Sequence, residues 1–427
     1  MILLYRILTT LIYPFLIFLI IFRKIIKKED SKRFKEKIFP SCFNIIKDEN
    51  KELIWFHAAS IGEFISILPI LEEINKISNK YEFLITTTTL SSARLADEEL
   101  KKIPNTQHRF FPLDVEFLIK NFLFLWKPKA IFLVDSEIWP NLIYLANKKG
   151  IPIALLNARI TLKTFNRWML FPSVAKRIFG LFNLCLASNT ETKNYLTKFH
   201  AKNIYFNGNI KLVSHVDRHK IKNLNEKIFL KRRFWLAAST HEGEEEFCIK
   251  THYKIKQRYG DILTIIAPRH IQRTKEIEKL CEKFNINYQT LSKNEIILED
   301  KELIIINSFG VLQNYFKYVK SVFIGKSTIS KLKNDAGQNP IDAAKLGCKV
   351  YHGPYIYNFK ETYEVLEKNN ISKKIENTKE LSDEIIRDLE NPYKEDSKIS
   401  VLINNLGQKT LADTMKNINN FLLNEIN

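Results

Sequence analysis

A serine and a glutamate stand three residues apart in the segment HAASIGE, residues 57–63, and this spacing suits two different roles. As a capping box, Ser60 and Glu63 would satisfy backbone N–H groups at the start of a helix. As a catalytic group, Glu63 would accept a proton from an attacking hydroxyl, while Gly62 would let a substrate approach the backbone. The dipole of a helix beginning here would lower the pKa of Glu63 and keep it ionised. The spacing alone leaves both roles open.

Two acids occur close together in DSEIWPN, residues 135–141, directly after the apolar run 131–134. Carboxylates at this place suit magnesium or manganese, but acids also favour the first turn of a helix. In the next polar segment, Arg159 either binds an anionic substrate group or pairs with one of these acids. Further on, Lys211 in GNIK is either a point positive charge for a ligand or a solvated lysine.

Three segments of the second half also place polar groups after candidate strands: STHEGEEE (239–246), APRH (267–270) and GQNPIDAA (337–344). Exposed N–H groups at the helix start after the first segment would hold a phosphate. Arg269 would bind a phosphate or a base edge. Asn339 and Asp342 would hydrogen-bond a base and a ribose, unless Asn339 only caps the helix that follows.

The elements that must position these residues alternate between strand-like and helix-like patterns. In the first half we expect strands at 53–57, 83–88, 130–134 and 153–156, and helices at 64–77 (with a kink at Pro69), 91–100 and 138–148. In the second half we expect strands at 234–238, 263–267, 303–306, 321–324 and 349–351. This alternation predicts an α/β protein built from βαβ units with parallel sheets.

A polar, lysine-rich stretch from 212 to 231 separates the two halves, and we place the domain boundary near residue 215. The prediction is an N-terminal domain over 28–215 and a C-terminal domain over 216–427, including a last helix at 411–423. Ligands of open α/β sheets bind outside the carboxyl ends of the strands, so we expect the polar segments to face a cleft between the halves. The sequence has neither G-x-G-x-x-G nor a P-loop, which argues against dinucleotide oxidoreductases and P-loop NTPases.

The chain has 427 residues and a formal net charge of +19, because 66 lysines and arginines face 47 acids. This charge favours anionic partners. Aromatic residues are not interleaved with Lys and Arg in the stripe typical of nucleic-acid binders, so we expect no nucleic-acid partner. The five cysteines are odd in number and form no C-x-x-C pair, which favours a reducing cytoplasmic compartment over a disulfide framework or a zinc site.

The N-terminus is strongly apolar. Residues 7–22 carry no charge, and Arg23, Lys24, Lys27 and Lys28 follow at once. No small-residue cleavage site is visible, so we expect a retained membrane anchor over residues 1–27 and not a removable signal peptide. The run would either span the bilayer or lie in its interface, and the basic flank favours a catalytic body on the cytoplasmic side. A buried core helix is the alternative.

The motifs, in their order along nearly the whole chain, resemble the Kdo (3-deoxy-D-manno-octulosonic acid) transferase family of lipopolysaccharide synthesis. The resemblance is carried by HAASIGE, TTTTLSS, FPLD, SEIWPN, NAR, GNIK, STHEGEE, PRH, GQNPIDAA and GPYIYNF. It implies a GT-B glycosyltransferase fold of two Rossmann-like domains, with CMP-Kdo as donor. It also implies the tetraacylated, bisphosphorylated lipid A precursor, lipid IVA, as acceptor at the cytoplasmic face of the inner membrane.

The same resemblance implies the site residues. Glu63 matches the catalytic base, and Asp135 and Lys211 match positions that stabilise the transition state. The CMP-binding residues implied are Pro268, Arg269, Phe309, Gly310, Val311, Asn339, Pro340, Ile341 and Asp342.

Four positions depart from the family pattern. Asp135 and Asp342 each stand where Glu is usual, Val311 stands where an acid is usual, and Lys326 in FIGKST stands where a second glycine is expected. We infer altered donor binding and an unchanged role for Glu63.

An inverting transfer needs one base for the acceptor hydroxyl and positive charge for the departing phosphate. Because CMP carries a single phosphate, we expect no metal and no other cofactor. An anionic membrane surface is the further partner that we expect, and an obligate protein partner is not predicted. The alternative function is another GT-B glycosyltransferase with a different nucleotide sugar.

Overall fold

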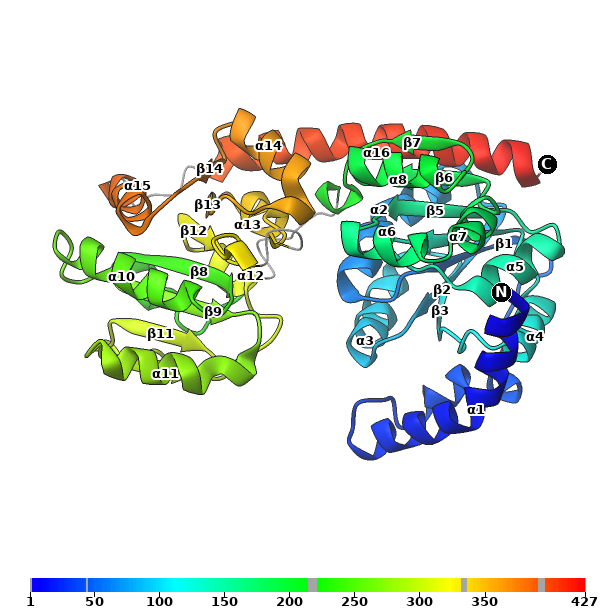
Figure 1. Cartoon of the computed structure of the whole chain (residues 1–427), viewed down its shortest axis with the longest axis horizontal. Coiled ribbons are helices and arrows are strands. Elements are labelled where there is room, and N and C mark those ends of the chain that lie inside the picture. The colour runs from blue at the N-terminus through cyan, green and yellow to red at the C-terminus, as the bar shows by residue number, and fades with distance from the viewer. Residues whose placement is uncertain (1, 44, 214–220, 332–335, 391–395, 427) are drawn as a thin grey trace. The chain divides into compact units, whose positions relative to one another are not determined.

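A computed structural model of the chain describes residues 2–43, 45–213, 221–331, 336–390 and 396–426. The chain divides into two compact units (Figure 1). Unit 1 comprises Met1–Ser214 and Leu406–Asn427, and unit 2 comprises His215–Asn405.

Unit 1 is built on a seven-stranded parallel sheet of order β3-β2-β1-β4-β5-β6-β7. The strands are β1 (Glu52–His57), β2 (Tyr81–Thr87), β3 (Thr106–Phe110), β4 (Ala130–Val134), β5 (Ile153–Ala158), β6 (Leu184–Ala187) and β7 (Ile204–Phe206). The central strands are apolar along their whole length because helices cover both faces of a parallel sheet. In register, Phe56 of β1 lies opposite Phe132 of β4, and their rings stack at 4.6 Å.

Helices cover both faces of this sheet in two layers. One apolar core contains residues of α1 (Ile2–Ile25), α4 (Glu116–Trp126), α5 (Pro140–Lys148), α7 (Pro172–Phe179) and α8 (Thr190–Lys198), and α6 (Leu162–Met169) packs against it. The other core contains residues of α2 (Ile61–Ile77), α3 (Leu90–Glu99) and the last helix, α16 (Asp396–Ile426).

Unit 2 repeats the plan with a seven-stranded parallel sheet of order β10-β11-β9-β8-β12-β13-β14. The strands are β8 (Phe234–Thr240), β9 (Leu263–Pro268), β10 (Tyr288–Leu291), β11 (Leu303–Ile306), β12 (Ser321–Ile324), β13 (Lys349–His352) and β14 (Ser372–Lys374). Its helices are α9 (Glu226–Lys231), α10 (Glu244–Lys256), α11 (Thr274–Lys283), α12 (Gln313–Phe316), α13 (Ile341–Lys345), α14 (Lys360–Lys368) and α15 (Thr378–Glu390). Strand β8 pairs with β9 on one side and with β12 on the other. The direction in which the chain adds strands to the sheet therefore reverses at β8.

The predicted α/β class and parallel sheets are confirmed, and every strand predicted from the sequence is present within two residues at each end. The predicted helices correspond to α2, α3 and α5, and Pro69 lies inside α2. Strands β3, β6, β7, β10 and β14 were not predicted.

The predicted C-terminal domain, residues 216–427, needs a correction at its end, because Leu406–Asn427 belong to unit 1. The predicted helix at 411–423 is the second half of the longer helix α16. Its apolar stripe, which includes Met415, Ile418 and Leu422, is buried in the same core as α2, and Phe421 contacts Phe132 edge to face at 5.4 Å. The stripe therefore completes the hydrophobic core of unit 1.

Among the described residues, α1 is the one helix that is long and apolar enough to cross a membrane by length and composition. It packs beside α4 and α5 of unit 1.

Candidate active site

The polar segments of unit 1 come together at the carboxyl ends of three neighbouring strands. Glu63 follows β1, Asp135 follows β4, and Asn157 stands near the end of β5. The side chain of Asn157 accepts a hydrogen bond from the backbone N–H of Ile210 at 3.0 Å. This contact fixes the short helix η4 (Ile210–Leu212), which carries Lys211. The structure thus brings Glu63, Asp135 and Lys211 to one edge of one sheet.

Glu63 forms the capping box that its spacing with Ser60 predicted. Its Oε1 accepts from the Ser60 hydroxyl at 2.8 Å, and its Oε2 accepts from the Ala59 N–H at 2.8 Å. In return, the Ser60 oxygen accepts from the Glu63 N–H. The carboxylate is therefore held in one orientation at the first turn of α2, while the side chain stays partly exposed.

The predicted lowering of the Glu63 pKa is wrong, because its pKa is raised. Burial is the largest cause, and the negative charge of Asp135 is the next. The hydroxyl of Ser60 and the ammonium of Lys211 act in the opposite direction with smaller effect. Loss of water and a neighbouring carboxylate thus raise the pKa of Glu63, as is typical of functional carboxylates.

Asp135 and Lys211 form a partly buried ion pair, with Lys211 Nζ 2.9 Å from Asp135 Oδ2. The Asp135 side chain is 8% exposed and that of Lys211 is 21% exposed, so the lysine is the member that solvent reaches. The alternative of a fully solvated Lys211 is therefore wrong. The pair holds one ammonium group in place beside Glu63.

The backbone at this edge adopts an uncommon conformation at two of the residues concerned. Asp135 has φ of 63° and Asn157 has φ of 50°, both in the left-handed region that costs most residues energy. The Asp135 N–H donates to the Leu156 carbonyl, and its own carbonyl accepts from the Arg159 N–H at 3.1 Å. These bonds fix the left-handed turn and with it the direction of the Asp135 side chain.

A second layer of contacts supports this group, and the sequence did not predict it. Glu137 Oε2 lies 3.2 Å from Nε2 of the fully buried His57 and accepts from the indole N–H of Trp139 at 2.9 Å. His57 Nδ1 lies 3.0 Å from the hydroxyl of Thr86 on β2. Both residues, His57 in HAASIGE and Glu137 in DSEIWPN, stand in motifs that the sequence singled out. Only the strand order β2-β1-β4 shows that they lie together.

The two acids of DSEIWPN are thus engaged by protein groups, Asp135 by Lys211 and Glu137 by His57 and Trp139. In the part of the chain that the structure describes, no three His, Cys, Asp or Glu side chains are grouped as a metal ion would need.

In unit 2, the loops after β8 and β12 meet on one buried carboxylate. Glu244 is fully buried, and its Oε2 accepts from the N–H groups of His241 at 3.0 Å and Lys326 at 2.6 Å. Its Oε1 accepts from the N–H groups of Ser327 and Thr328 and from the Thr328 hydroxyl. The sequence predicted that N–H groups at STHEGEEE bind a phosphate. One of them, the His241 N–H, donates to this internal carboxylate.

Lys326, the residue that replaces an expected glycine, has φ of 56°. A left-handed conformation is what a glycine adopts at little cost, so lysine here is strained. The carbonyl of Lys326 accepts from the Gly337 N–H at 2.7 Å, which connects this loop to the GQNPIDAA segment.

The predicted CMP-binding residues form three segments, after β9, after β11 and at the start of α13. Pro268 is buried at the end of β9, and the N–H of the exposed Arg269 donates to the Thr240 carbonyl at 3.0 Å. In GQNPIDAA, the Asn339 side chain accepts from the Ile341 N–H at 3.1 Å, but the N-cap position of α13 is Pro340, so Asn339 stands one residue before the cap. Pro340 and Ile341 are buried, and Asp342 is partly exposed near the buried Lys345. Backbone bonds through Thr240, Lys326 and Gly337 connect these segments around the carboxyl ends of β8, β9 and β12.

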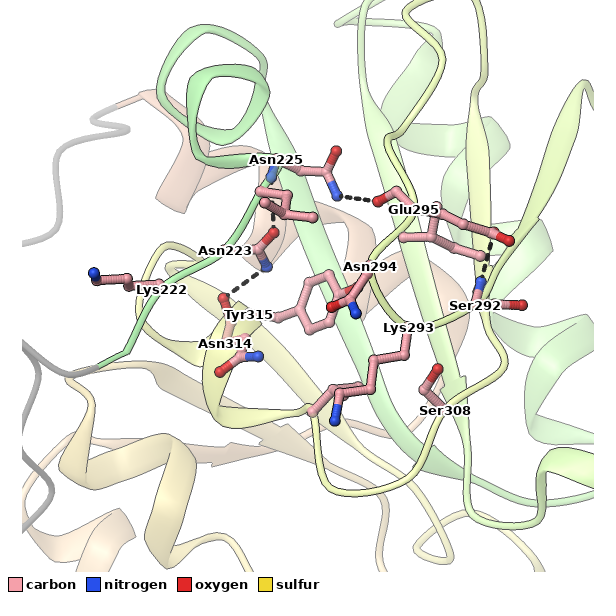
Figure 2. A pocket seen from close by; sticks show the side chains of 13 residues that line it. Lys222, Asn223, Asn225, Ser292, Lys293, Asn294, Glu295, Ser308, Asn314 and Tyr315 are labelled. Atoms are coloured by element: carbon pink, nitrogen blue, oxygen red, sulfur yellow. Dashed lines mark hydrogen bonds between the residues drawn. The ribbon is translucent and has the colours of Figure 1, made fainter.

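The third predicted segment follows β11. Phe309 is exposed, Gly310 has φ of +75°, and Val311 lines a polar pocket. Figure 2 shows this pocket, where Asn223 donates to the Asn314 carbonyl at 3.0 Å and Asn225 donates to the Glu295 carbonyl at 3.1 Å. Lys222 and Lys293 add positive charge to its lining. The sequence did not predict this pocket.

Solved structures identify the class of fold. A putative UDP-N-acetylglucosamine 2-epimerase from Listeria monocytogenes is 13% identical, and the match covers 87% of this chain and 97% of that one with a TM-score of 0.57. A glycosyltransferase from Rickettsia africae is 12% identical, with coverage of 88% and 100% and a TM-score of 0.56. With its two parallel Rossmann-like sheets, the chain has a GT-B glycosyltransferase fold.

Sequence comparisons narrow the class to a family. The family model described as 3-deoxy-D-manno-octulosonic-acid transferase (kdotransferase) matches residues 32–214. The probable mitochondrial 3-deoxy-D-manno-octulosonic acid transferase of Arabidopsis thaliana is 31% identical over 379 residues, which are 86% of this chain and 83% of that protein. The 3-deoxy-D-manno-octulosonic acid transferase of Rickettsia bellii is 31% identical over 361 residues, 82% of each chain. The chain therefore belongs to the Kdo transferase family and is a glycosyltransferase.

Proposed function

We propose that the protein transfers Kdo from CMP-Kdo to the lipid A precursor lipid IVA, with inversion at the anomeric carbon. The observation that carries this proposal is the group formed by Glu63, Asp135 and Lys211 at one edge of the unit 1 sheet. The group combines a carboxylate of raised pKa with a fixed ammonium, which are the two chemical elements that an inverting sugar transfer uses.

Glu63 acts as the general base in this proposal. The acceptor hydroxyl gives its proton to the Glu63 carboxylate as its oxygen forms a bond to the anomeric carbon of Kdo. The bond from that carbon to the phosphate oxygen breaks at the same time, and CMP leaves with the electron pair. The raised pKa supports the role, because a base accepts a proton most effectively when its pKa approaches the working pH. The hydrogen bonds from Ser60 and Ala59 hold the carboxylate in orientation.

Lys211 supplies positive charge where negative charge develops in the transition state, and Asp135 positions it. An ammonium held by a buried carboxylate has lost much of its conformational freedom before the substrate binds. Such preorganised charge stabilises a transition state without further rearrangement.

CMP binds to unit 2 in this proposal. The candidate contacts are Pro268 and Arg269 after β9, the turn Phe309–Val311 after β11, and Asn339, Pro340, Ile341 and Asp342 at α13. Arg269 supports the assignment because its exposed guanidinium stands at the carboxyl end of a central strand, where open α/β sheets bind ligands. Asp135, Asp342, Val311 and Lys326 depart from the family pattern, and we propose that those in unit 2 alter the affinity for the donor.

No metal and no other cofactor enters the proposed mechanism, because the departing CMP carries a single phosphate. The proposed acceptor is a bisphosphorylated lipid and therefore a component of a membrane. We place the catalytic body at the cytoplasmic face of the inner membrane, where it would meet this lipid. The net charge of +19 supports contact with an anionic bilayer. The proposal includes neither a nucleic acid nor an obligate protein partner.

Calorimetry with the full chain tests the donor assignment. CMP and CMP-Kdo should bind, a UDP-sugar should bind more weakly, and Arg269→Ala should weaken CMP binding. Lys275→Ala, on α11 of the same unit, is the surface control and should leave CMP binding unchanged. Equal affinity for CMP and UDP, or a CMP affinity unaffected by Arg269→Ala, would count against the assignment.

A further inference from the structure

Helix α1 turns one narrow stripe of residues toward the body of unit 1. The residues of α1 that are buried or partly buried are Ile2, Tyr5, Arg6, Thr9, Tyr13, Leu16, Ile17, Ile20 and Arg23. They recur every three or four positions, so they form a single face that runs along the whole helix. The helix therefore contacts the body along its full length.

The first half of this face is polar and makes specific contacts. Tyr5 donates to the buried carboxylate of Asp114 at 3.1 Å, and Arg6 Nε donates to Glu116 at 2.8 Å. The Asn141 side chain at the start of α5 donates to the Thr9 hydroxyl at 3.2 Å. These bonds attach α1 to the N-terminal ends of α4 and α5.

The second half of the face is attached as well. The Tyr13 hydroxyl donates to the Ile38 carbonyl, and its ring meets Phe117 edge to face at 4.9 Å. Ile20 is buried in a small apolar cluster with Phe34 and Ile38. At the end of the helix, Arg23 pairs with the buried Glu29 at 2.7 Å.

The opposite face of α1 is apolar and uncovered. The large apolar side chains that it exposes are Leu3, Leu4, Ile7, Leu8, Leu11, Ile12, Phe15, Phe18, Leu19, Ile21, Phe22 and Ile25. Phe124 of α4 is also exposed. A continuous apolar surface of this length on a water-soluble body would be unfavourable, so it marks a contact surface.

These two faces decide between a spanning and an in-plane helix. With 24 residues, α1 is about 36 Å long, which would suffice to cross a bilayer. A crossing helix, however, would take Tyr5 and Arg6 to the far interface and Thr9 into the hydrocarbon, away from their partners on unit 1. Unpaired polar groups in the hydrocarbon are strongly disfavoured.

We propose that α1 lies in the plane of the membrane as a monotopic anchor, inserting its exposed apolar face into one leaflet of an anionic bilayer while its polar face stays docked on unit 1. Charge around the helix fits this partner. Lys24, Lys27 and Lys28 follow the apolar run, and a groove beside Phe124 is lined by Lys120, Lys148 and Lys149. Glu116 accepts from Arg6 and pairs with Lys120 at 2.6 Å, so the docking contacts adjoin this basic groove. This inference concerns the membrane contact and does not depend on the reaction catalysed.

Depth measurements along α1 test the proposal directly. An environment-sensitive label is placed on a cysteine at Leu4, Leu11 or Phe18, in the full chain carrying Cys42→Ser, and quenched by nitroxide lipids in vesicles containing phosphatidylglycerol. An in-plane helix predicts nearly equal depths for the three labels. A spanning helix predicts a difference of about 21 Å between Leu4 and Phe18, at 1.5 Å per residue. A label at the exposed Ile77 of α2, on the other face of the sheet, is the control that should stay unquenched.

A topology measurement gives a second readout. The full chain is made in bacteria with a protease-cleavable tag before Met1, and inverted membrane vesicles are treated with protease. An in-plane anchor predicts that the tag is cleaved without detergent, because it lies on the same side as the body. Protection of the tag until detergent is added, a depth gradient along α1, or absence of quenching at all three positions would overturn the proposal.

Discussion

Glu63 combines two functions in one carboxylate, because it completes the capping box of α2 and stands beside Asp135 with a raised pKa. Glutamine also satisfies a capping box at this position. We therefore expect Glu63→Gln to fold normally and to lose about 10²–10⁴-fold in turnover, the usual contribution of a general base. Circular dichroism and a transfer assay measure the two properties. Near-normal turnover would remove Glu63 from the catalytic role, whereas a parallel loss of stability would favour a role in capping alone.

The raised pKa of Glu63 predicts a specific pH dependence. Between the unfolded pKa, about 4.3, and the higher folded value, the folded state binds more protons than the unfolded state, so this group lowers stability as the pH rises. The stability of the wild type relative to Glu63→Gln should therefore fall as the pH rises above about 4.3. Chemical denaturation at several pH values measures this difference. A relative stability that rises with pH would mean that the pKa is lowered.

At the residue scale, the sequence predicted contacts between near neighbours and missed those between distant ones. The Ser60–Glu63 cap was visible because both partners lie in one helical turn. The direction of the Glu63 pKa was wrong because Asp135 and the burial around Glu63 come from other strands. The His57–Glu137 contact was missed for the same reason, since 80 residues separate its partners.

At the scale of elements, Glu244 joins the loops after β8 and β12. Removing one acceptor from buried N–H groups typically costs about 1–3 kcal/mol, and in this case it would also release the loop that contacts the GQNPIDAA segment. We expect Glu244→Gln to weaken CMP binding by about tenfold, the equivalent of 1.4 kcal/mol, as measured by calorimetry well below the unfolding temperature.

Glu245→Gln is the matched control for this prediction. Glu245 lies beside Glu244 on α10 and is equally buried. It differs in its partner, because it pairs with Arg273 at 2.7 Å. Both variants should lower the melting temperature, and only Glu244→Gln should change the affinity for CMP. Equal effects of the two variants on CMP affinity would reduce Glu244 to a general structural residue.

The last helix makes a separate prediction about the core of unit 1. Phe421 of α16 is 6% exposed and packs on Phe132. Removing a buried phenylalanine side chain typically costs about 3–5 kcal/mol, so Phe421→Ala should lower the free energy of unfolding of unit 1 by about that amount. Leu423→Ala is the control, because Leu423 is 61% exposed and should change stability little. Equal effects of the two substitutions would contradict the packing of α16 on unit 1.

The sequence predicted long apolar strands well and short or polar strands poorly. Strand β3, TQHRF, has few apolar residues, and β7 and β14 have three residues each at the sheet edges. Edge strands need less apolar surface, so their pattern is weak. The return of α16 to unit 1 was not predicted because the helical spacing of Leu411, Met415 and Ile418 shows that a face is buried without showing against what.

For the molecule as a whole, the order of many weak motifs identified the family, and the sequence comparisons confirmed it over most of the chain. The sequence left open whether the N-terminal segment spans the bilayer. That question depends on which residues of α1 contact unit 1. The partners of Tyr5 and Thr9 are Asp114 and Asn141, which lie 109 and 132 residues away, so the sequence does not show these contacts.

The reaction that we propose is the transfer of Kdo from CMP-Kdo to lipid IVA. Its most direct test incubates the full chain with both substrates in vesicles, in the presence of a metal chelator, and measures the mass of the lipid product. We expect a lipid that is heavier by one or more Kdo residues, formed in equal amount with and without the chelator and lost with Glu63→Gln. An unchanged lipid mass under conditions where CMP-Kdo binds would contradict the claim, and a product that forms only when magnesium is restored would contradict the metal-free mechanism.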